Sequence, residues 1–225
     1  WLAWAKNGQA AGTAGLAKRL EAIQIVVVAR GTMVQNNVNG IVSRYGRNYV
    51  SLNGASDVNV GGQETTNITY RTHVQSYGWQ GWKNNGVMAG TSGRAKRLEG
   101  IEIKLTNQQY TGNIVYRTHV QSYGWESRWR MNGEMSGTSG QAKRLEAIQI
   151  YLTGELANHY DVYYRVHAQS FGWLSWAKNG EASGTAGLAK RLEGIQIILV
   201  PKGSPEPGRT YDNITATNTV SFIRR

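Results

Sequence analysis

The sequence predicts an all-β domain with pseudo-threefold symmetry and a β-prism-like architecture. All eight tryptophans fall into four pairs, and after each pair the chain repeats an Asn-Gly, a Gly-Thr-x-Gly and a Lys-Arg-Leu-Glu. We number the copies one to four. Copies two to four are complete and span residues 67–200, which suits three small sheets closing around one core. A β-trefoil-like fold is the alternative, and separate solenoid-like units rank third, because one copy could not bury its apolar face alone.

The first strand of each complete copy is expected to precede its tryptophans. Residues 70–77 alternate in character, as a strand with one buried face does, and the same pattern restarts at Tyr116 and Tyr164. One predicted face carries Tyr70, Thr72 and Val74, and the other carries Arg71, His73, Gln75 and Tyr77.

The Asn-Gly at a fixed place in every copy predicts a type I′ hairpin turn. In copy two this turn would join adjacent antiparallel strands at 82–84 and 87–89. A further strand follows at 101–105, where isoleucine and leucine alternate with charged residues. The intervening Lys-Arg-Leu-Glu contains good helix formers, but the glycines and β-branched residues close to it favour a strand.

Four segments lie outside the three complete copies. Residues 1–30 form a partial repeat that starts at its tryptophan pair, so we expect the sequence to be a piece of a longer protein. Residues 31–66 are rich in asparagine and glycine and are expected to form a β-rich insertion or linking module. Residues 201–212 contain proline and glycine and predict a linker, and residues 213–225 predict a terminal strand.

The terminal strand loosely echoes the first strand of copy two, because NITATNTVSF at 213–222 resembles NITYRTHVQS at 67–76. We therefore hypothesise that the tail provides the strand that the partial repeat lacks, within one molecule or in the next subunit. In the second case the head-to-tail contact does not close, and it would propagate into a filament.

Composition limits the partners and the chemistry. The formal net charge of +11 favours acidic partners, but no run of Lys or Arg exceeds two residues, so no nucleic-acid partner is expected. The absence of cysteine excludes disulfides and thiolate metal sites. No apolar stretch is long enough to span a membrane.

The combined motifs resemble a known family. With Gly-Trp-x-x-Trp, the Asn-Gly and Gly-Thr-x-Gly-x-x-Lys-Arg-Leu-Glu-Ala-Ile-x-Ile, the sequence resembles the ChW repeat, the clostridial hydrophobic repeat with a conserved tryptophan. The resemblance covers residues 1–28 and 67–200. It implies an extracellular or wall-associated protein of a Gram-positive bacterium, with a role in surface assembly, adhesion or polysaccharide binding, and it implies no catalytic residue.

The tryptophans of the complete copies are candidate sugar-binding platforms, because sugar rings present C–H faces to aromatic surfaces. Core packing is the competing interpretation, and we favour it. At a spacing of three on one strand, the two members of a pair would face opposite sides, one buried and one exposed. The candidates are Trp79, Trp82, Trp125, Trp129, Trp173 and Trp176.

Two other repeated positions, a lysine and a histidine, provide candidate binding residues. Lys96, Lys143 and Lys190 are candidates for contact with the ligand, whereas the adjacent arginine and the glutamate two residues later predict an ion pair on one strand face. His73, His119 and His167 would bind zinc if they converged near the threefold axis. We favour a hydrogen-bonded structural histidine, because no carboxylate shell recurs nearby.

An enzyme is not expected, because a repeated motif provides neither a unique pair of carboxylates nor a nucleophile elbow, and no cofactor is expected. We predict a non-enzymatic extracellular surface protein that binds acidic or neutral polysaccharide of the cell wall or of a host surface. The alternative is a structural subunit of a surface filament or layer, assembled by strand exchange through the C-terminal tail.

Overall fold

The computed structural model of the protein describes residues 66–225, which form almost only β-strands and one short helix, α1 (Leu156–His159). The partial repeat at 1–30 and the insertion at 31–66 therefore lie outside the described residues, apart from residue 66. No helix among residues 66–225 has the length and apolar character needed to cross a membrane.

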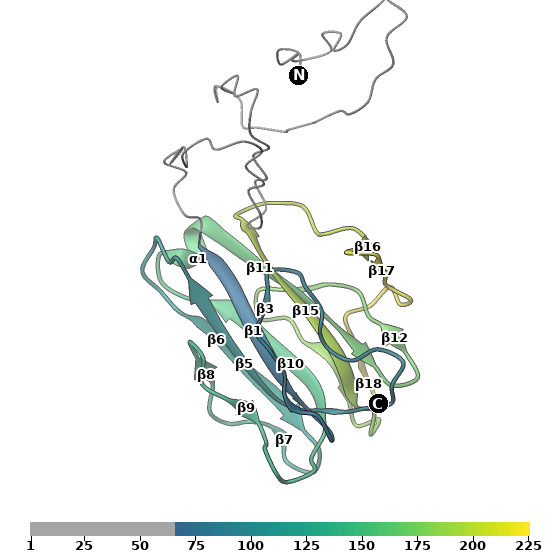
Figure 1. The fold of residues 1–225 in the computed structure, drawn as a ribbon. Coiled ribbons are helices and arrows are strands. Elements are labelled where there is room, and N and C mark those ends of the chain that lie inside the picture. The colour runs from purple at the N-terminus through teal and green to yellow at the C-terminus, as the bar shows by residue number, and fades with distance from the viewer. Residues whose placement is uncertain (1–65) are drawn as a thin grey trace, which may run out of the picture. The chain divides into compact units, whose positions relative to one another are not determined.

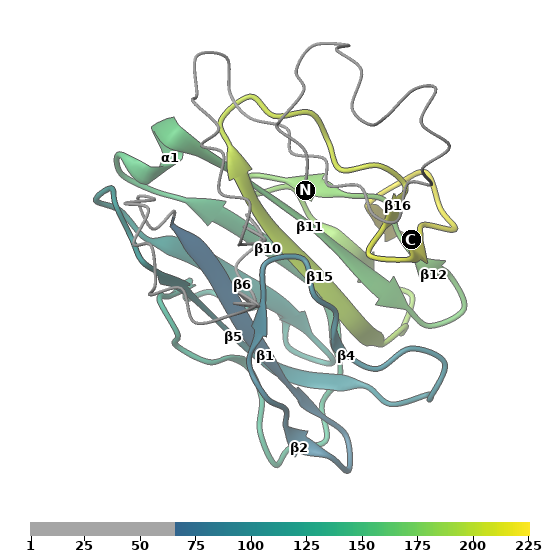
Figure 2. The same cartoon turned by 45° about the horizontal axis from the view of Figure 1, so that its top comes forward.

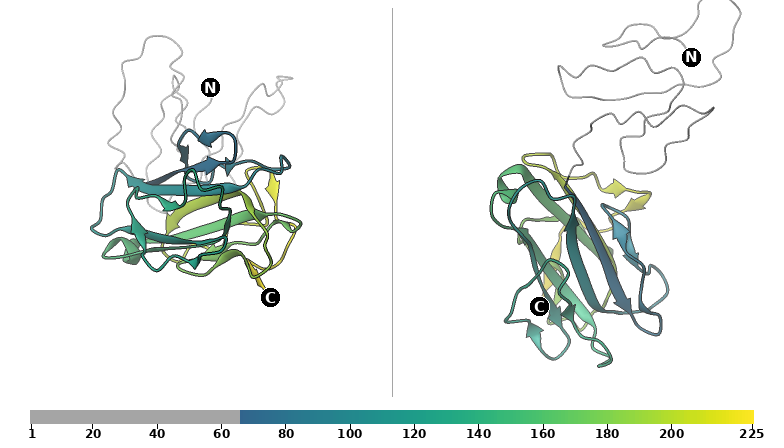
Figure 3. Two further views of the ribbon diagram at one scale, coloured as in Figure 1. Left: turned by 90° about the horizontal axis from the view of Figure 1, so that it is seen from below. Right: turned by 60° about the vertical axis from the view of Figure 1, so that its left-hand side comes forward.

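Each complete copy forms one pair of long antiparallel strands. These pairs run obliquely beside one another (Figure 1), and Figure 3 shows them from below and from the side. The pairs are β1 (Asn67–Val74) with β5 (Leu98–Thr106), β6 (Ile114–Val120) with β10 (Leu145–Leu152), and β11 (Tyr160–Ala168) with β15 (Leu192–Pro201). Two short strands flank the first strand of each pair: β2 (Gly78–Trp79) and β3 (Lys83–Asn84), β7 (Gly124–Trp125) and β8 (Arg130–Met131), and β12 (Gly172–Trp173) and β13 (Ala177–Lys178).

One further strand of each copy joins the sheet of a neighbouring copy. Strand β9 (Ser136–Gly137) of copy three pairs with β5 of copy two, and β14 (Ser183–Ala186) of copy four pairs with β10 of copy three. Strand β4 (Ala89–Gly90) of copy two completes the cycle by pairing with β15 of copy four. Three open sheets thus surround one core, which confirms the all-β pseudo-threefold domain.

The Asn-Gly turns form, but the predicted pairing of their two arms is wrong. The predicted type I′ geometry fits copies three and four, where Asn132 and Asn179 have positive φ, but not copy two, where only Gly86 of the Asn-Gly pair does. In copy two the turn is closed by a hydrogen bond from Val87 N–H to Asn84 O (2.9 Å). Its arms then separate, because β3 pairs with β1 of the same copy whereas β4 pairs with β15 of copy four. A two-residue strand makes few bonds with another short strand, and the long strand of the neighbour provides a better template. Copy four also accepts a hydrogen bond from this turn, because Gly86 N–H donates to Ile197 O at 2.7 Å.

The inner faces of the three sheets form the core. Tyr70, Thr72 and Val74 are fully buried, as the alternation predicted, and Arg71 and His73 point to the outer face. The hydroxyl of each core tyrosine accepts a hydrogen bond from a backbone N–H of the preceding copy, counted around the ring. Burial raises the pKa of all three hydroxyls: Tyr70, Tyr116 and Tyr164.

The tail after residue 201 crosses copy four. The expected single strand at 213–225 is instead two short strands, β17 (Ile214–Thr215) and β18 (Phe222–Arg224), and β17 forms a hairpin with β16 (Thr210–Tyr211) at the end of the expected linker. Strand β18 pairs in parallel with β14 of copy four. Figures 1 and 2 show the hairpin beside copy four. The partial repeat that we expected the tail to complete lies outside the described residues.

Candidate functional site

The outer face of each sheet carries an arginine between two tryptophans. We call this arrangement the Trp–Arg–Trp group. In copy two the guanidinium carbon of Arg71 lies 4.9 Å from the ring centres of both Trp79 and Trp82. The group of copy three is Trp125, Arg117 and Trp129, and the group of copy four is Trp173, Arg165 and Trp176.

The structure corrects one prediction about the tryptophans and bears out the other only in copy four. The two members of a pair do not face opposite sides, because both lie against one arginine. None of the six belongs to the central core, but Trp173 and Trp176 are buried, and Trp176 packs with Tyr163 and Ile198 in a second cluster. The first tryptophan is held by strand pairing, as Trp79 is opposite His73. The second follows the end of that short strand, so the chain can turn it back over the same face.

The arginine is held in place by the neighbouring long strand. Its Nε donates to Glu102 in copy two (2.7 Å), to Gln149 in copy three (2.9 Å) and to Gln196 in copy four (2.8 Å). With Nε occupied and two tryptophan rings beside the guanidinium, its terminal amino groups remain as donors. Arginine is suited to this role because its planar fork presents several donors at once. Arg71, Arg117 and Arg165 were not among the predicted binding residues, although each stands two residues before a repeated histidine on the predicted outer face.

A histidine, a glutamate and a second arginine extend each group along the sheet. In copy two His73 packs edge-on against Trp79 (5.5 Å), and its Nδ1 lies 3.0 Å from Glu99. Glu99 also accepts from Arg97 at 2.8 Å, which confirms the predicted ion pair, and the other two copies repeat the contacts. In copy four burial lowers the pKa of His167, the charge of Glu193 opposes this effect, and Arg191 adds to it.

The three histidines do not converge on a zinc site. His73, His119 and His167 lie in three different sheets, and each faces its own glutamate. Within residues 66–225 no group of His, Asp and Glu side chains is arranged to hold a metal ion.

In copy four the tail covers the Trp–Arg–Trp group. The terminal amino groups of Arg165 donate to the carbonyl oxygens of Arg209 (2.8 Å), Tyr211 (3.2 Å) and Ile214 (2.8 Å). Trp176 Nε1 donates to Gly208 O at 3.2 Å, and the ring of Tyr211 packs edge-on against Trp176. Arg165 is fully buried, and this burial lowers its pKa to about 10.

In copies two and three the corresponding groups are open. Within the described part of the chain, nothing accepts a hydrogen bond from the terminal amino groups of Arg71 or Arg117, or from the indole nitrogens of Trp82 and Trp129. Trp82 is 37% exposed, whereas its equivalent in copy four, Trp176, is 5% exposed. Residues 66–225 therefore contain one filled group and two open ones.

The candidate lysines lie apart from these groups, at the end of the domain where the first strands turn. Lys96 Nζ is 3.4 Å from Ser76 Oγ and 5.8 Å from the ring centre of Tyr77. Lys143 and Lys190 make the same contact with Ser122 and Ser170.

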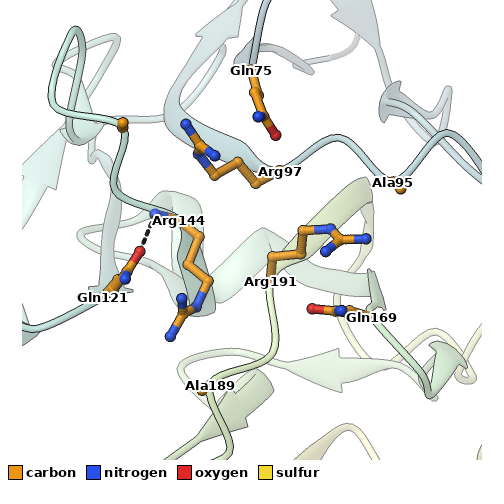
Figure 4. Close-up of a pocket in the computed structure, with 9 residues that line it drawn as sticks. Gln75, Ala95, Arg97, Gln121, Arg144, Gln169, Ala189 and Arg191 are labelled. Carbon is orange, nitrogen blue, oxygen red and sulfur yellow. Dashed lines mark hydrogen bonds between the residues drawn. The ribbon is translucent and has the colours of Figure 1, made fainter.

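At this end a pocket of about 470 Å³ lies among the three copies. Figure 4 shows its three arginine side chains spreading away from one another, so they do not converge on its centre. The pocket is lined by Gln75, Ala95, Arg97, Gln121, Ala142, Arg144, Gln169, Ala189 and Arg191.

The comparisons with known proteins agree with the repeat. The model of a family described as clostridial hydrophobic W matches residues 1–29, 73–107, 119–154 and 167–201. The search of the curated proteins and the search of the solved structures gave no match.

Proposed function

Given that the chain belongs to the clostridial hydrophobic W (ChW) family, whose repeats are found in bacterial surface proteins, we propose that it is a non-enzymatic extracellular binding module. Its ligand is polysaccharide of the cell wall or of a host surface. The open Trp–Arg–Trp groups of copies two and three are the binding sites.

One observation carries this proposal. The same group occurs three times, and in copy four it is filled by a segment that brings oxygen acceptors to the arginine and an aromatic ring to the tryptophan. Copies two and three have the same donors and rings without that segment. A sugar chain provides both oxygen acceptors and C–H faces for aromatic rings. Two weak sites on one protein chain would bind a long polysaccharide at the same time, and this avidity would raise the overall affinity.

The experiment compares binding of the full chain to insoluble Gram-positive cell walls and to their solubilised polysaccharide. The test variant Arg71→Gln/Arg117→Gln removes both open guanidinium groups. The control Arg94→Gln/Arg225→Gln removes the same charge from exposed positions outside the groups. We expect the test variant to lose most of the binding and the control to keep it, with both variants folded by circular dichroism. Equal binding by the two variants contradicts the proposal.

The second candidate function is a structural subunit that assembles by exchange of the tail. The position of the tail supports it, because residues 208–224 bind copy four mainly through backbone contacts after a segment that contains Pro205 and Pro207. Docking the tail on copy four of the next molecule would use the same contacts and extend into a filament. Deleting residues 209–225 is then expected to abolish concentration-dependent assembly in sedimentation velocity. Assembly that is unchanged by the deletion excludes this candidate.

A further inference from the structure

The segment that fills the copy-four group indicates which ligand chemistry the open groups can recognise. All four acceptors that the tail presents to Arg165 and to Trp176 Nε1 are amide carbonyl oxygens, from Gly208, Arg209, Tyr211 and Ile214. Within residues 66–225 no carboxylate forms an ion pair with Arg165, although its guanidinium is fully buried. A filled Trp–Arg–Trp group is therefore satisfied by neutral amide carbonyls and does not require an anion.

We propose that the open groups of copies two and three recognise amide carbonyl oxygens, so that the polysaccharide they bind is a polymer of N-acetylated amino sugars. The inference rests on the proposed function, because it concerns the same two groups, and it specifies the chemical class of the ligand.

Copy three reproduces the filled group most closely. Arg117 lies 5.2 and 4.4 Å from its two tryptophan rings, and Arg165 lies 5.4 and 4.5 Å from its own. In both copies Nε is held by a glutamine, Gln149 or Gln196, so neither guanidinium is neutralised by its holding partner. Arg117 is thus held in the same way as the arginine that binds the tail.

Copy two differs from copy three in the charges around its arginine. Its Arg71 is held by Glu102, and this carboxylate already compensates the charge of the guanidinium. In addition, Lys104 Nζ lies 4.2 Å from the ring centre of Trp82, at the position where copy three has Tyr151. The charges around the two groups therefore differ, with Glu102 and Lys104 beside the copy-two group only, whereas the neutral donors are the same. An uncharged acceptor can bind to both groups.

The acetamido group is the part of a sugar that matches this requirement. A guanidinium and an indole N–H only donate hydrogen bonds. A carbonyl oxygen accepts two of them and has no proton of its own, whereas a hydroxyl presents a proton that competes. In an N-acetylated sugar the carbonyl is attached to a pyranose ring. The ring can lie against the tryptophan while the carbonyl accepts from the arginine.

The test uses three oligosaccharides of equal length with the full-length chain: a β-1,4-linked N-acetylglucosamine hexamer, cellohexaose and hexagalacturonate. Binding is followed by isothermal titration calorimetry. We expect the acetylated hexamer to bind at least roughly tenfold more tightly than the other two, because one or two carbonyl hydrogen bonds distinguish them. The variant Arg117→Lys keeps the charge but loses the planar fork. Arg117→Lys should weaken binding of the acetylated hexamer, and the control Arg94→Lys should leave this binding unchanged.

The outcomes separate this inference from the proposed function. Equal or tighter binding of cellohexaose or hexagalacturonate overturns the N-acetyl inference, and the proposed function survives if that binding depends on Arg71 and Arg117. If no oligosaccharide and no wall polysaccharide binds, both fail. Binding of a synthetic peptide of residues 205–218 to copies two and three, without binding of the acetylated hexamer, overturns the inference in favour of a polypeptide ligand.

Discussion

The backbone N–H of Ile197 donates a hydrogen bond of 3.0 Å to the hydroxyl of Tyr70, although 127 positions separate the two residues. The bond joins copy four to copy two. The pairs Ile103 with Tyr116 and Ile150 with Tyr164 join the other neighbouring copies in the same way. These bonds and the exchanged strands hold the three sheets in a ring. They therefore fix where the outer face of each sheet lies.

Replacing Tyr70 with Phe should destabilise the domain by about 1–3 kcal/mol, because a buried backbone N–H and the carbonyl of Val87 both lose their partner. The free energy of unfolding in urea measures the effect. Tyr77→Phe is the matched control, since Tyr77 is 49% exposed. Equal stability of the two variants would show that the hydroxyl of Tyr70 does not contribute to ring closure.

Deleting residues 209–225 should create one additional polysaccharide site per chain. The deletion uncovers Arg165, Trp173 and Trp176, whose contacts with the tail include three hydrogen bonds to the guanidinium. The stoichiometry in calorimetric titration measures the gain, and Arg165→Gln in the shortened chain should reverse it. A stoichiometry that does not change on deletion would mean that the tail does not cover a binding site.

The acid stability of the domain should depend on Asp161. This carboxylate is 1% exposed, and burial alone would raise its pKa. Hydrogen bonds from Asn179, Lys178, Gly203 N–H and Lys202 outweigh burial and hold the pKa of Asp161 well below its usual range. Its stabilising contribution is therefore complete above the unfolded-state pKa of about 3.9 and is lost as the pH falls below that value.

Asp161→Asn should lower the free energy of unfolding at pH 7 by on the order of 2 kcal/mol, because both lysines lose their partner. It should also flatten the decline of stability between pH 4 and pH 2, about the range in which the carboxylate titrates. Urea unfolding across this range measures both effects. A variant with the same acid profile as the wild type would refute the assignment.

A second pH dependence is expected near neutrality from His167. Burial is the largest cause that lowers its pKa, so the folded state favours the neutral imidazole. Stability is then complete above the unfolded-state pKa of about 6.5 and declines as the pH falls below it. His167→Gln should reduce this decline between about pH 6.5 and pH 5. An NMR titration of His167 that gives an elevated pKa would reverse the sign and contradict the account.

The sequence was sufficient to predict features that each copy determines locally. The period of the repeat predicted the pseudo-threefold domain, and alternation placed Tyr70 inside and Arg71 outside. The two-residue spacing of Arg97 and Glu99 predicted their ion pair. Each of these depends on the geometry of a single strand, which a pattern of period two reveals.

Features that depend on contacts between segments were not predictable in this way. The Asn-Gly turn has the same local chemistry whether β4 returns to its own copy or joins β15 of copy four, and packing between copies decides the partner. The tryptophan spacing did not reveal that the second ring turns back over Arg71, because Trp82 lies outside a strand. Among the three described groups, which one the tail fills depends on where the chain runs after β15.

The most direct test of the proposed binding sites is an NMR titration that follows the indole N–H resonances while wall polysaccharide fragments are added. We expect the signals of Trp82 and Trp129 to shift and to give similar affinities, because their Nε1 atoms belong to the open groups. The signal of Trp176 should not shift, because its Nε1 is bonded to Gly208 O. A shift of Trp176 alone, or no shift of Trp82 and Trp129 under saturating fragment, would contradict it.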